Sequence, residues 1–247
     1  MNNVETEEKN CDDFVEKIFH FKEIDSTNTF AKELGIFPVK GCFVIWADRQ
    51  SAGRGRRDNL FFSGEGGIYA SIVCNVPDVS VHFFYNRALS LAICDAVEEL
   101  VPDAGLYIKW PNDIFRKNRK LCGILLESAN NSSRHLVAGF GLNVNIPAEK
   151  FPEEIKNIAT SILEQAGIVF DNKALLMNIC RLFEKNIFED PVVSHERYVR
   201  RLYRAGDTIR INNIVGIMET VLIDGQLCIN TGKEKLLLSS GSIEFIT

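Results

Sequence analysis

The sequence predicts an α+β fold, in which a mixed sheet flanked by helices is followed by a small C-terminal β-barrel. Two observations lead to this prediction. Strand-like and helix-like segments are mixed over residues 14–203 without the regular alternation of a doubly wound fold. From about residue 206 the chain changes to short β-type runs separated by Asp-Gly, Thr-Gly and Ser-Gly turn signals. We therefore place one domain at 1–204 and a second at 205–247.

Short apolar runs predict the strands of the first domain. They cover residues 14–24, 41–47, 67–76, 106–110, 121–128 and 135–146. A turn at Lys117–Asn118 can make the 121–128 strand antiparallel to the segment before it. Residues 48–66 are rich in glycine, arginine and polar side chains, which predicts a loop.

Capping residues and helical spacing predict the helices. Ser26 is a suitable N-cap for a short helix that Gly35 can close. Apolar residues recur at helical spacing over 85–100, and the pattern stops before Pro102. Further helices are expected at 159–167, at 171–188 with Asp171 as N-cap, and at 194–203.

The composition is that of an ordinary globular protein. The chain has 247 residues, 46% of them hydrophobic, and 28 Lys and Arg against 33 Asp and Glu give a net charge of −5. This excludes a collagen, a coiled-coil rod and a disordered chain. No apolar run approaches the roughly 18 residues of a membrane span, and the polar, acidic start MNNVETEEKN lacks the features of a secretory signal. We expect a soluble, cytoplasmic protein with no membrane partner.

The seven cysteines are widely scattered, and no two form a CxxC pair. Because the length and spacing do not resemble those of a disulfide-stapled mini-domain, we expect most of them to be small core residues. The four histidines show no metal-ligand spacing. The acidic balance argues against a general nucleic-acid binder, which needs a basic face.

The segment 47–67 has the chemistry of a phosphate-binding loop. Gly53 and Gly55 bracket Arg54, and Arg56 and Arg57 follow. Glycines allow close approach of the backbone, and guanidinium groups bind phosphate bidentately. The segment matches neither the GxxxxGK[ST] loop nor the GxGxxG fingerprint of dinucleotide sites. Taken alone, it could also be a solvated basic turn or an RNA-contacting loop.

A second cationic segment covers 108–128. Lys109 ends a strand and Pro111 favours an extended turn. Asn112 and Asp113 begin the segment that follows this turn. Five basic residues and one acidic residue give the window 109–120 a local charge of +4. Asp113 could hold Mg²⁺ beside a nucleotide phosphate. A hairpin turn with a solvated tip would explain this segment alone. It explains less well why two cationic loops flank strands that we expect in one sheet.

Four strings, GRGRR, KWPNDI, RKLCGILLE and GFGLNVN, together resemble the biotin–protein ligases, also called biotin–[acetyl-CoA-carboxylase] ligases. They occur in that family's order and at its usual spacing. The resemblance covers about residues 20–247 and implies a class II synthetase-like catalytic domain with an SH3-like C-terminal domain. Only about twenty residues precede the catalytic region. We therefore expect a monofunctional member without the N-terminal DNA-binding domain and without specific DNA binding.

The resemblance implies a two-step reaction with biotin and ATP as substrates and Mg²⁺ as the metal. Biotin and ATP give biotinyl-5′-AMP and pyrophosphate. A lysine of a biotin carrier domain, from a carboxylase or decarboxylase, then attacks the adenylate and releases AMP. Because adenylation brings two anions together, fixed cations and backbone donors are the catalysts one expects. The sequence leaves open whether the protein is a monomer or a homodimer.

The resemblance also implies roles for individual residues, matched motif by motif. The catalytic residues are Arg54, Arg56, Lys109 and Lys120. The biotin side comprises Ser26, Thr27, Asn28, Gln50, Arg54, Gly55, Arg56, Lys109 and Gly123, with the Ser-Thr-Asn segment on the ureido head. The ATP and adenylate side comprises Arg56, Phe61, Asn112, Lys120, Gly141 and Asn143, and Asp113 is the metal ligand. Phe61 stands where the family commonly has tryptophan, and Trp110 is expected to be a core or wall residue.

Two other functions fit parts of the pattern. A lipoate–protein ligase belongs to the same superfamily, although it would need different glycine-rich and lysine motifs. A nucleic-acid-binding or repressor protein would use the cationic loops and the barrel. The acidic net charge and the absence of a helix-turn-helix pattern stand against it.

Overall fold

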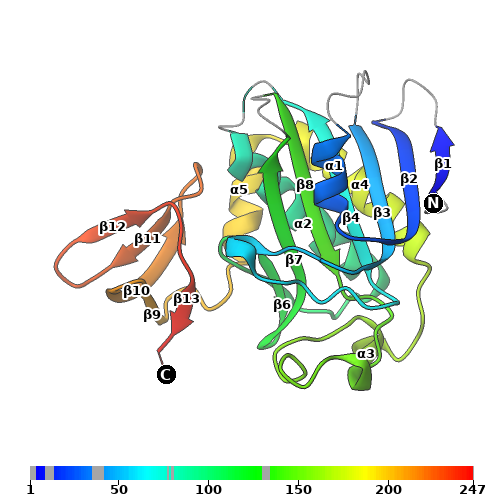
Figure 1. The fold of residues 1–247 in the computed structure, drawn as a ribbon. Coiled ribbons are helices and arrows are strands. Elements are labelled where there is room, and N and C mark those ends of the chain that lie inside the picture. Colours follow the sequence, from blue (N-terminus) through cyan, green and yellow to red (C-terminus); the bar gives the residue numbers. More distant parts are fainter. Residues whose placement is uncertain are drawn as a thin grey trace.

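The computed structural model describes residues 4–8, 14–34, 42–76, 78, 81–129 and 134–246. In this part of the chain the strands form two sheets, which Figure 1 shows as separate bodies. The larger sheet has eight strands in the order β1-β2-β3-β4-β8-β7-β6-β5. β2 and β3 pair in parallel and the other neighbours are antiparallel, so the sheet is mixed. The predicted α+β fold is confirmed.

The larger sheet consists of β1 (Val4–Glu8), β2 (Val15–Ile24), β3 (Cys42–Gln50), β4 (Ile68–Asn75), β5 (Leu106–Lys109), β6 (Asp113–Arg116), β7 (Arg119–Ser128) and β8 (His135–Leu142). The second sheet, in the order β12-β11-β10-β9-β13, consists of β9 (Thr208–Ile211), β10 (Ile214–Val221), β11 (Leu227–Asn230), β12 (Lys235–Leu238) and β13 (Ile243–Phe245). Its five antiparallel strands are consistent with the predicted SH3-like domain.

Three strand predictions need correction. β1 was not predicted, because its letters VETEE carry no apolar pattern and the strand forms by pairing with β2. β3 continues to Gln50, so residues 48–50 are strand rather than loop, held by the pairing of Ile24 with Gln50. β8 ends at Leu142 instead of residue 146. The turn at Lys117–Asn118 is confirmed, and it joins β7 to a separate short strand, β6.

The helices are α1 (Thr27–Glu33), α2 (His82–Leu100), α3 (Leu163–Ala166), α4 (Asn172–Phe188) and α5 (Pro191–Arg200). The predicted caps are present. The Ser26 side chain accepts from the backbone N–H of Thr29, and that of Asp171 accepts from the first turn of α4. Gly35, the predicted end of α1, lies outside the described residues.

Two helix predictions differ from the structure. The helix expected at 159–167 is reduced to the single turn of α3, which ends at Gly167 in the left-handed conformation. α5 begins at Pro191 rather than residue 194. The Asp190 carboxylate caps it, and proline suits its first turn because that position needs no N–H donor.

The two faces of the large sheet have different partners, because successive side chains of a strand point to opposite sides. On β4, Ile68, Ala70 and Ile72 belong to the main hydrophobic core, which also contains the apolar faces of α2 and α4. Tyr69 and Ser71 point to the other face, where α1 packs across β3, β4 and β8. Figure 1 shows the sheet between α1 on one side and α2 and α4 on the other.

Hydrogen bonds from the Trp110 turn and from α2 join the second sheet to the first domain. Trp110 is buried, as predicted, and its Nε1 donates to the carbonyl of Gly225 at 3.0 Å. The buried Arg87 of α2 donates to the carbonyl of Ile223 at 3.3 Å. The Trp110–Pro111 peptide is cis. Throughout the described ranges, no helix combines the length and apolar character needed to cross a membrane.

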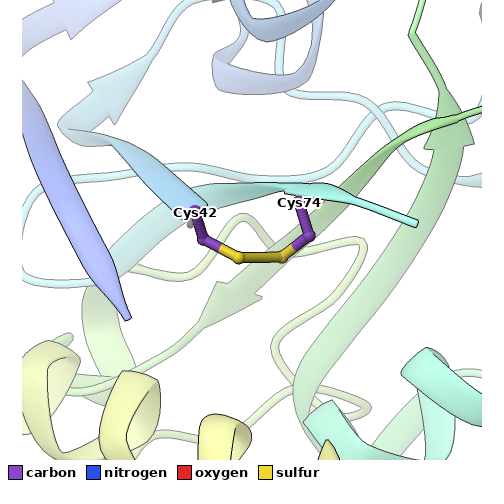
Figure 2. The surroundings of a disulfide bond; sticks show 2 residues. All are labelled: Cys42 and Cys74. Atoms are coloured by element: carbon purple, nitrogen blue, oxygen red, sulfur yellow. A yellow bond between two sulfur atoms is a disulfide. The ribbon is translucent and has the colours of Figure 1, made fainter. Parts of the chain in front are cut away.

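The cysteine prediction is wrong for one pair. Cys42 of β3 and Cys74 of β4 are joined by a disulfide, and Figure 2 shows it bridging the two neighbouring strands. The pair lies at one register position with Cα atoms 4.6 Å apart, within the range that a disulfide needs. The described cysteines 94, 122, 180 and 228 are buried free thiols, as predicted.

We predict that peptide mapping without reduction will recover Cys42 and Cys74 in one linked species. Reduction should lower the free energy of unfolding by up to about 4 kcal/mol, because a cross-link over 32 residues restricts the unfolded chain. Urea unfolding with and without reductant measures this. The double variant Cys42→Ala/Cys74→Ala is the control and should not respond to reductant. Two unlinked, freely alkylated thiols in air-oxidised native protein would contradict the prediction.

Candidate active site

A patch without side chains lies on the α1 face of the large sheet. Gly123 of β7 and Gly141 of β8 are register partners, and Gly139 points to the same face two residues earlier. A Cβ on Gly139 would lie 1.9 Å from Oδ1 of Asn28, and a Cβ on Gly141 would lie 2.3 Å from the Phe61 ring. Two side chains from outside the sheet therefore occupy space that only glycine leaves open.

Amide and hydroxyl groups gather at one end of this patch. The backbone N–H of Thr27 donates to Gln50 Oε1 at 2.8 Å, and Gln50 Nε2 donates to Ser63 Oγ at 2.9 Å. Asn28 Nδ2 donates to the carbonyl of Leu125 at 3.2 Å. The first turn of α1 is thus fixed both to the end of β3 and to β7, and it presents a cluster of neutral hydrogen-bonding groups.

Cationic side chains gather at the other end. Arg56 Nη1 donates to Asn112 Oδ1 at 3.1 Å, which joins the glycine-rich loop to the turn between β5 and β6. Lys120 Nζ lies 2.7 Å from Asp113 Oδ1. Lys109 Nζ lies over the ring of Phe115 at 5.2 Å from its centroid. The two cationic segments of the sequence therefore meet in space.

Partial burial shapes the electrostatics of this end. Burial lowers the pKa of Arg56, the neighbouring charge of Arg57 lowers it further, and Asp113 acts in the opposite direction. Burial also lowers the pKa of Lys109, opposed by Asp113 and reinforced by Lys120. Such desolvated, crowded cations favour a bound anion, because its negative charge replaces the stabilisation that they lose when water is excluded.

Three cavities meet at this patch. A central cavity of about 50 Å³ is lined by Ser26, Thr27, Asn28, Gln50, Arg54, Gly55, Arg56, Phe61, Asn112, Lys120, Gly123, Ile124, Leu125, Gly139, Phe140 and Gly141. An apolar cavity of about 190 Å³ is lined by Leu60, Phe61, Phe62, Lys120, Asn143, Phe151, Ile155, Ile158 and Ala159. Phe61 and Lys120 line both of them.

The third cavity is polar, also about 190 Å³, and lies between the two sheets. It is lined by Gly55, Arg56, Asn59, Leu60, Phe61, Lys109, Trp110, Pro111, Asn112, Asp113, Lys120, Gly241, Ser242 and Ile243. Arg57 Nη1 donates to Ser242 Oγ at 3.1 Å, which ties the glycine-rich loop to the second sheet. The C-terminal segment thus forms one wall of this cavity.

The structure brings together every residue that the sequence predicted for the site. Twelve of them line the central cavity, Asn143 lines the apolar cavity, and Lys109 and Asp113 line the polar one. Their individual roles remain predictions.

Several residues of the site were not predicted, and four of them shape the hydrogen-bonding end: Ser63, Ser71, Glu127 and Gly139. Ser71 is a lone hydroxyl in the apolar strand IYASIVCN, and Glu127 ends the RKLCGILLE string, so both left a signal in the sequence. Gly139 lies within the GFGLNVN region, two residues before Gly141. Ser63 left no signal that separates it from its polar neighbours.

A neutral hydrogen-bonding end, a cationic end and an apolar side cavity define a small-molecule site that accepts negatively charged groups. A model of the biotin/lipoate A/B protein ligase family matches residues 20–145, and the chain belongs to this family.

Two curated relatives illustrate the similarity. The biotin–[acetyl-CoA-carboxylase] ligase of Mycobacterium tuberculosis is 31% identical over 214 residues, which are 81% of this chain and 77% of that protein. The bifunctional ligase/repressor BirA of Bacillus spizizenii is 35% identical over 167 residues, which are 66% of this chain and 51% of that protein. The chain therefore spans about half the length of this BirA relative.

A solved structure extends the similarity to both sheets. The biotin protein ligase of Aquifex aeolicus, in complex with biotin and ATP, superposes with a TM-score of 0.80 and 26% identity. The match covers 93% of this chain and 98% of that one. It therefore includes the C-terminal sheet, which lies beyond the range of the family model.

We predict that Gly139→Ala lowers the free energy of unfolding by about 1–3 kcal/mol, because the new methyl group overlaps Oδ1 of Asn28. Urea unfolding measures the change. In an Asn28→Ala background the space is free, so the same substitution should cost less than half as much. Equal costs in the two backgrounds would show that the methyl group meets some other obstacle.

Proposed function

We propose that this chain activates biotin with ATP to form biotinyl-5′-AMP and pyrophosphate, and then transfers the biotinyl group to a lysine of a biotin carrier domain. One observation carries the proposal: the three cavities meet at Phe61 and Lys120. A ligand with a neutral polar head, a carboxylate and an attached nucleotide would extend through all three. Two relatives support the same function: the Mycobacterium tuberculosis protein is a biotin–[acetyl-CoA-carboxylase] ligase, and the Aquifex aeolicus protein is a biotin protein ligase in complex with biotin and ATP.

The hydrogen-bonding end suits the head of biotin. Its ureido group carries two N–H donors and a carbonyl acceptor, and Thr27, Asn28 and Gln50 offer amide and hydroxyl partners. Ile124, Leu125 and the glycine strands supply apolar surface for the fused rings. The central cavity of about 50 Å³ has room for only a few water molecules, which is less than a fused two-ring ligand needs. The bound ligand would therefore displace the Phe61 ring from the glycine patch.

The cationic end suits the reaction. A biotin carboxylate oxygen attacks the α-phosphorus of ATP, forming a new P–O bond while the bond to the pyrophosphate leaving group breaks. Arg54, Arg56, Lys109 and Lys120 would screen the repulsion between the two anions and stabilise charge on the phosphoryl oxygens. The polar cavity beside Lys109 and Asn112 would receive the pyrophosphate.

The apolar cavity suits adenine. Its aromatic walls include Phe61, Phe62 and Phe151, which can pack on a flat base. Asn143 Nδ2 donates to the carbonyl of Thr160 at 2.9 Å, and this orients the amide. Among the described residues, Oδ1 of Asn143 is buried and finds no hydrogen-bond partner. Because an unpaired buried acceptor is costly, this oxygen favours a base with an N–H donor, such as the amino group of adenine.

The residues present fit Mg²⁺ only as an ion carried mainly by phosphates. Within the described ranges no group of three or more His, Cys, Asp or Glu side chains could hold a metal. Asp113 offers one carboxylate on the wall of the polar cavity. Mg²⁺ is commonly bound by one or two carboxylates together with substrate phosphates and water. Mg²⁺ bound to ATP would neutralise part of the triphosphate charge, with Asp113 as its protein ligand.

In the second step the amine of the carrier lysine attacks the carbonyl carbon of the mixed anhydride. An amide bond forms, the bond from that carbon to the phosphate oxygen breaks, and AMP leaves with the electron pair. The carrier belongs to a biotin-dependent carboxylase or decarboxylase in this proposal. We also propose that the catalytic domain is residues 1–204 and the C-terminal domain is residues 205–247.

The test uses the native protein with biotin, ATP and Mg²⁺. We expect exchange of labelled pyrophosphate into ATP that depends on biotin, and a mass gain of one biotinyl group on an added carrier domain that depends on ATP. Lipoate in place of biotin tests the other branch of the family. Folded protein that exchanges no pyrophosphate with biotin, or that prefers lipoate, would overturn the proposal.

The lowered pKa of Lys109 predicts an alkaline limit on the exchange rate. The side chain is charged below its pKa, and burial places that pKa below the ordinary lysine value of about 10.4. The rate should therefore fall as pH rises through this lowered pKa. In Lys109→Arg the charge persists to higher pH, so the fall should move upward by at least one pH unit.

The matched control is Lys117→Arg, which makes the same change at the exposed hairpin tip. Its profile should coincide with that of the native protein. Identical alkaline midpoints in native protein and Lys109→Arg would assign the fall to another group.

A further inference from the structure

The Glu127 carboxylate connects three separate parts of the hydrogen-bonding end. Oε2 accepts from Asn28 Nδ2 at 2.9 Å, and Oε1 accepts from Lys32 Nζ at 2.8 Å. Arg54 Nη1 lies 3.7 Å from Oε1. A single side chain of β7 thus contacts two turns of α1 and the start of the glycine-rich loop, although these segments lie at least 73 residues away in the sequence.

The carboxylate is held in its charged form. Burial by itself would raise the pKa of Glu127, but the hydrogen bonds from Lys32 and Asn28 and the charges of Lys32 and Arg54 outweigh it, so the pKa is lowered. An ionised carboxylate can only accept hydrogen bonds. The NH₂ group of Asn28, rather than its oxygen, must therefore face Glu127.

The orientation of the Asn28 amide determines the direction of the hydrogen bonds that the neighbouring hydroxyl groups make. With its NH₂ group donating to Leu125 and Glu127, Asn28 turns Oδ1 toward Ser71 Oγ, 2.6 Å away. Ser71 Oγ also lies 2.8 Å from Thr27 Oγ1. A hydroxyl carries one proton, and the amide oxygen of Asn28 can only accept. Ser71 therefore gives its proton to Asn28, and Thr27 Oγ1 gives its own either to Ser71 Oγ or to Gln50 Oε1, 3.2 Å away. Either arrangement leaves the lone pairs of Thr27 Oγ1 for a ligand in the cavity.

We propose that Glu127 is a positioning residue that sets the donor and acceptor pattern of the biotin head site through Asn28, Ser71 and Thr27. The inference rests on the proposed function. A carboxylate outside the central cavity fixes Thr27 as an acceptor, and an acceptor is what the N–H groups of a ureido ring require. Removing Glu127 takes away the shorter of the two hydrogen bonds that orient the Asn28 amide and leaves only the longer one to Leu125, so the direction of the hydroxyl protons is less firmly fixed.

The first experiment compares Glu127→Ala and Glu127→Gln in biotin-dependent pyrophosphate exchange. We expect the KM for biotin to rise about 10- to 100-fold in Glu127→Ala, the usual effect of losing hydrogen bonds to a charged group. The KM for ATP and kcat at saturating biotin should stay within about twofold. Glu127→Gln should raise the KM for biotin less, because its amide oxygen can still accept from Asn28.

The matched control is Glu189→Ala. The Glu189 side chain is 20% exposed, against 21% for Glu127, and it is paired with Arg197 at 2.6 Å between α4 and α5. Its loss should cost stability without changing the KM for biotin. An equal loss in every kinetic parameter of Glu127→Ala would assign Glu127 a general structural role and overturn the inference.

A double-mutant cycle tests whether Glu127 acts through Asn28. Glu127→Ala should add less than about threefold to the KM for biotin in an Asn28→Ala background, because the amide that it orients is gone. Multiplicative effects of the two substitutions would overturn the inference. If Glu127→Ala does not fold, the same cycle with Glu127→Gln decides the question by the same criterion.

The outcomes separate this inference from the function on which it rests. Native protein without biotin-dependent exchange would overturn both. Native exchange together with an unchanged KM for biotin in both Glu127 variants would overturn only the role of Glu127.

Discussion

Three missing side chains on one face of the large sheet are the constraint on which the site depends. Gly123, Gly139 and Gly141 leave β7 and β8 bare where other strand residues would fill the space. Asn28 enters over Gly139, and the Phe61 ring lies over Gly141. Because the opposite face of the same strands is packed against α2, which α4 covers in turn, a shift of the sheet would disturb the main core. The glycine patch is therefore held in place by the core beneath it. Any rearrangement falls to the segments above it, which carry Asn28 and Phe61.

An acidic chain can hold an anion site because its fold gathers cationic side chains in one place. The net charge of −5 says little about the local field, because Arg56 of the glycine-rich loop, Lys109 at the end of β5 and Lys120 of β7 line one cavity. Partial burial keeps water from screening them, as the lowered pKa values of Arg56 and Lys109 show. Asp113 offsets part of the repulsion among these cations. Local geometry rather than overall charge determines what binds.

The sequence predicted the parts of this site that are written in contiguous strings. GRGRR and KWPND identified the cations, and RKLCGILLE and GFGLNVN identified Gly123 and Gly141 as site residues. It could not reveal Glu127 as a partner of Asn28, because that contact spans 99 positions and depends on α1 crossing the sheet. The Cys42–Cys74 disulfide was missed for the same reason, since only the register of β3 with β4 places the two cysteines side by side. Strand ends were also set by pairing, as the extension of β3 to Gln50 shows.

The polar cavity depends on both sheets, because Gly241, Ser242 and Ile243 form one of its walls. Trp110 lies within the first two thirds of the chain, yet its indole bonds to the second sheet, and the cavity beside it is closed by residues more than 120 positions later. The glycine patch and the hydrogen-bonding end are built from residues between 26 and 141, whereas the polar cavity lacks one wall until the second sheet is in place. The polar cavity is therefore the part of the site whose shape depends on the second sheet.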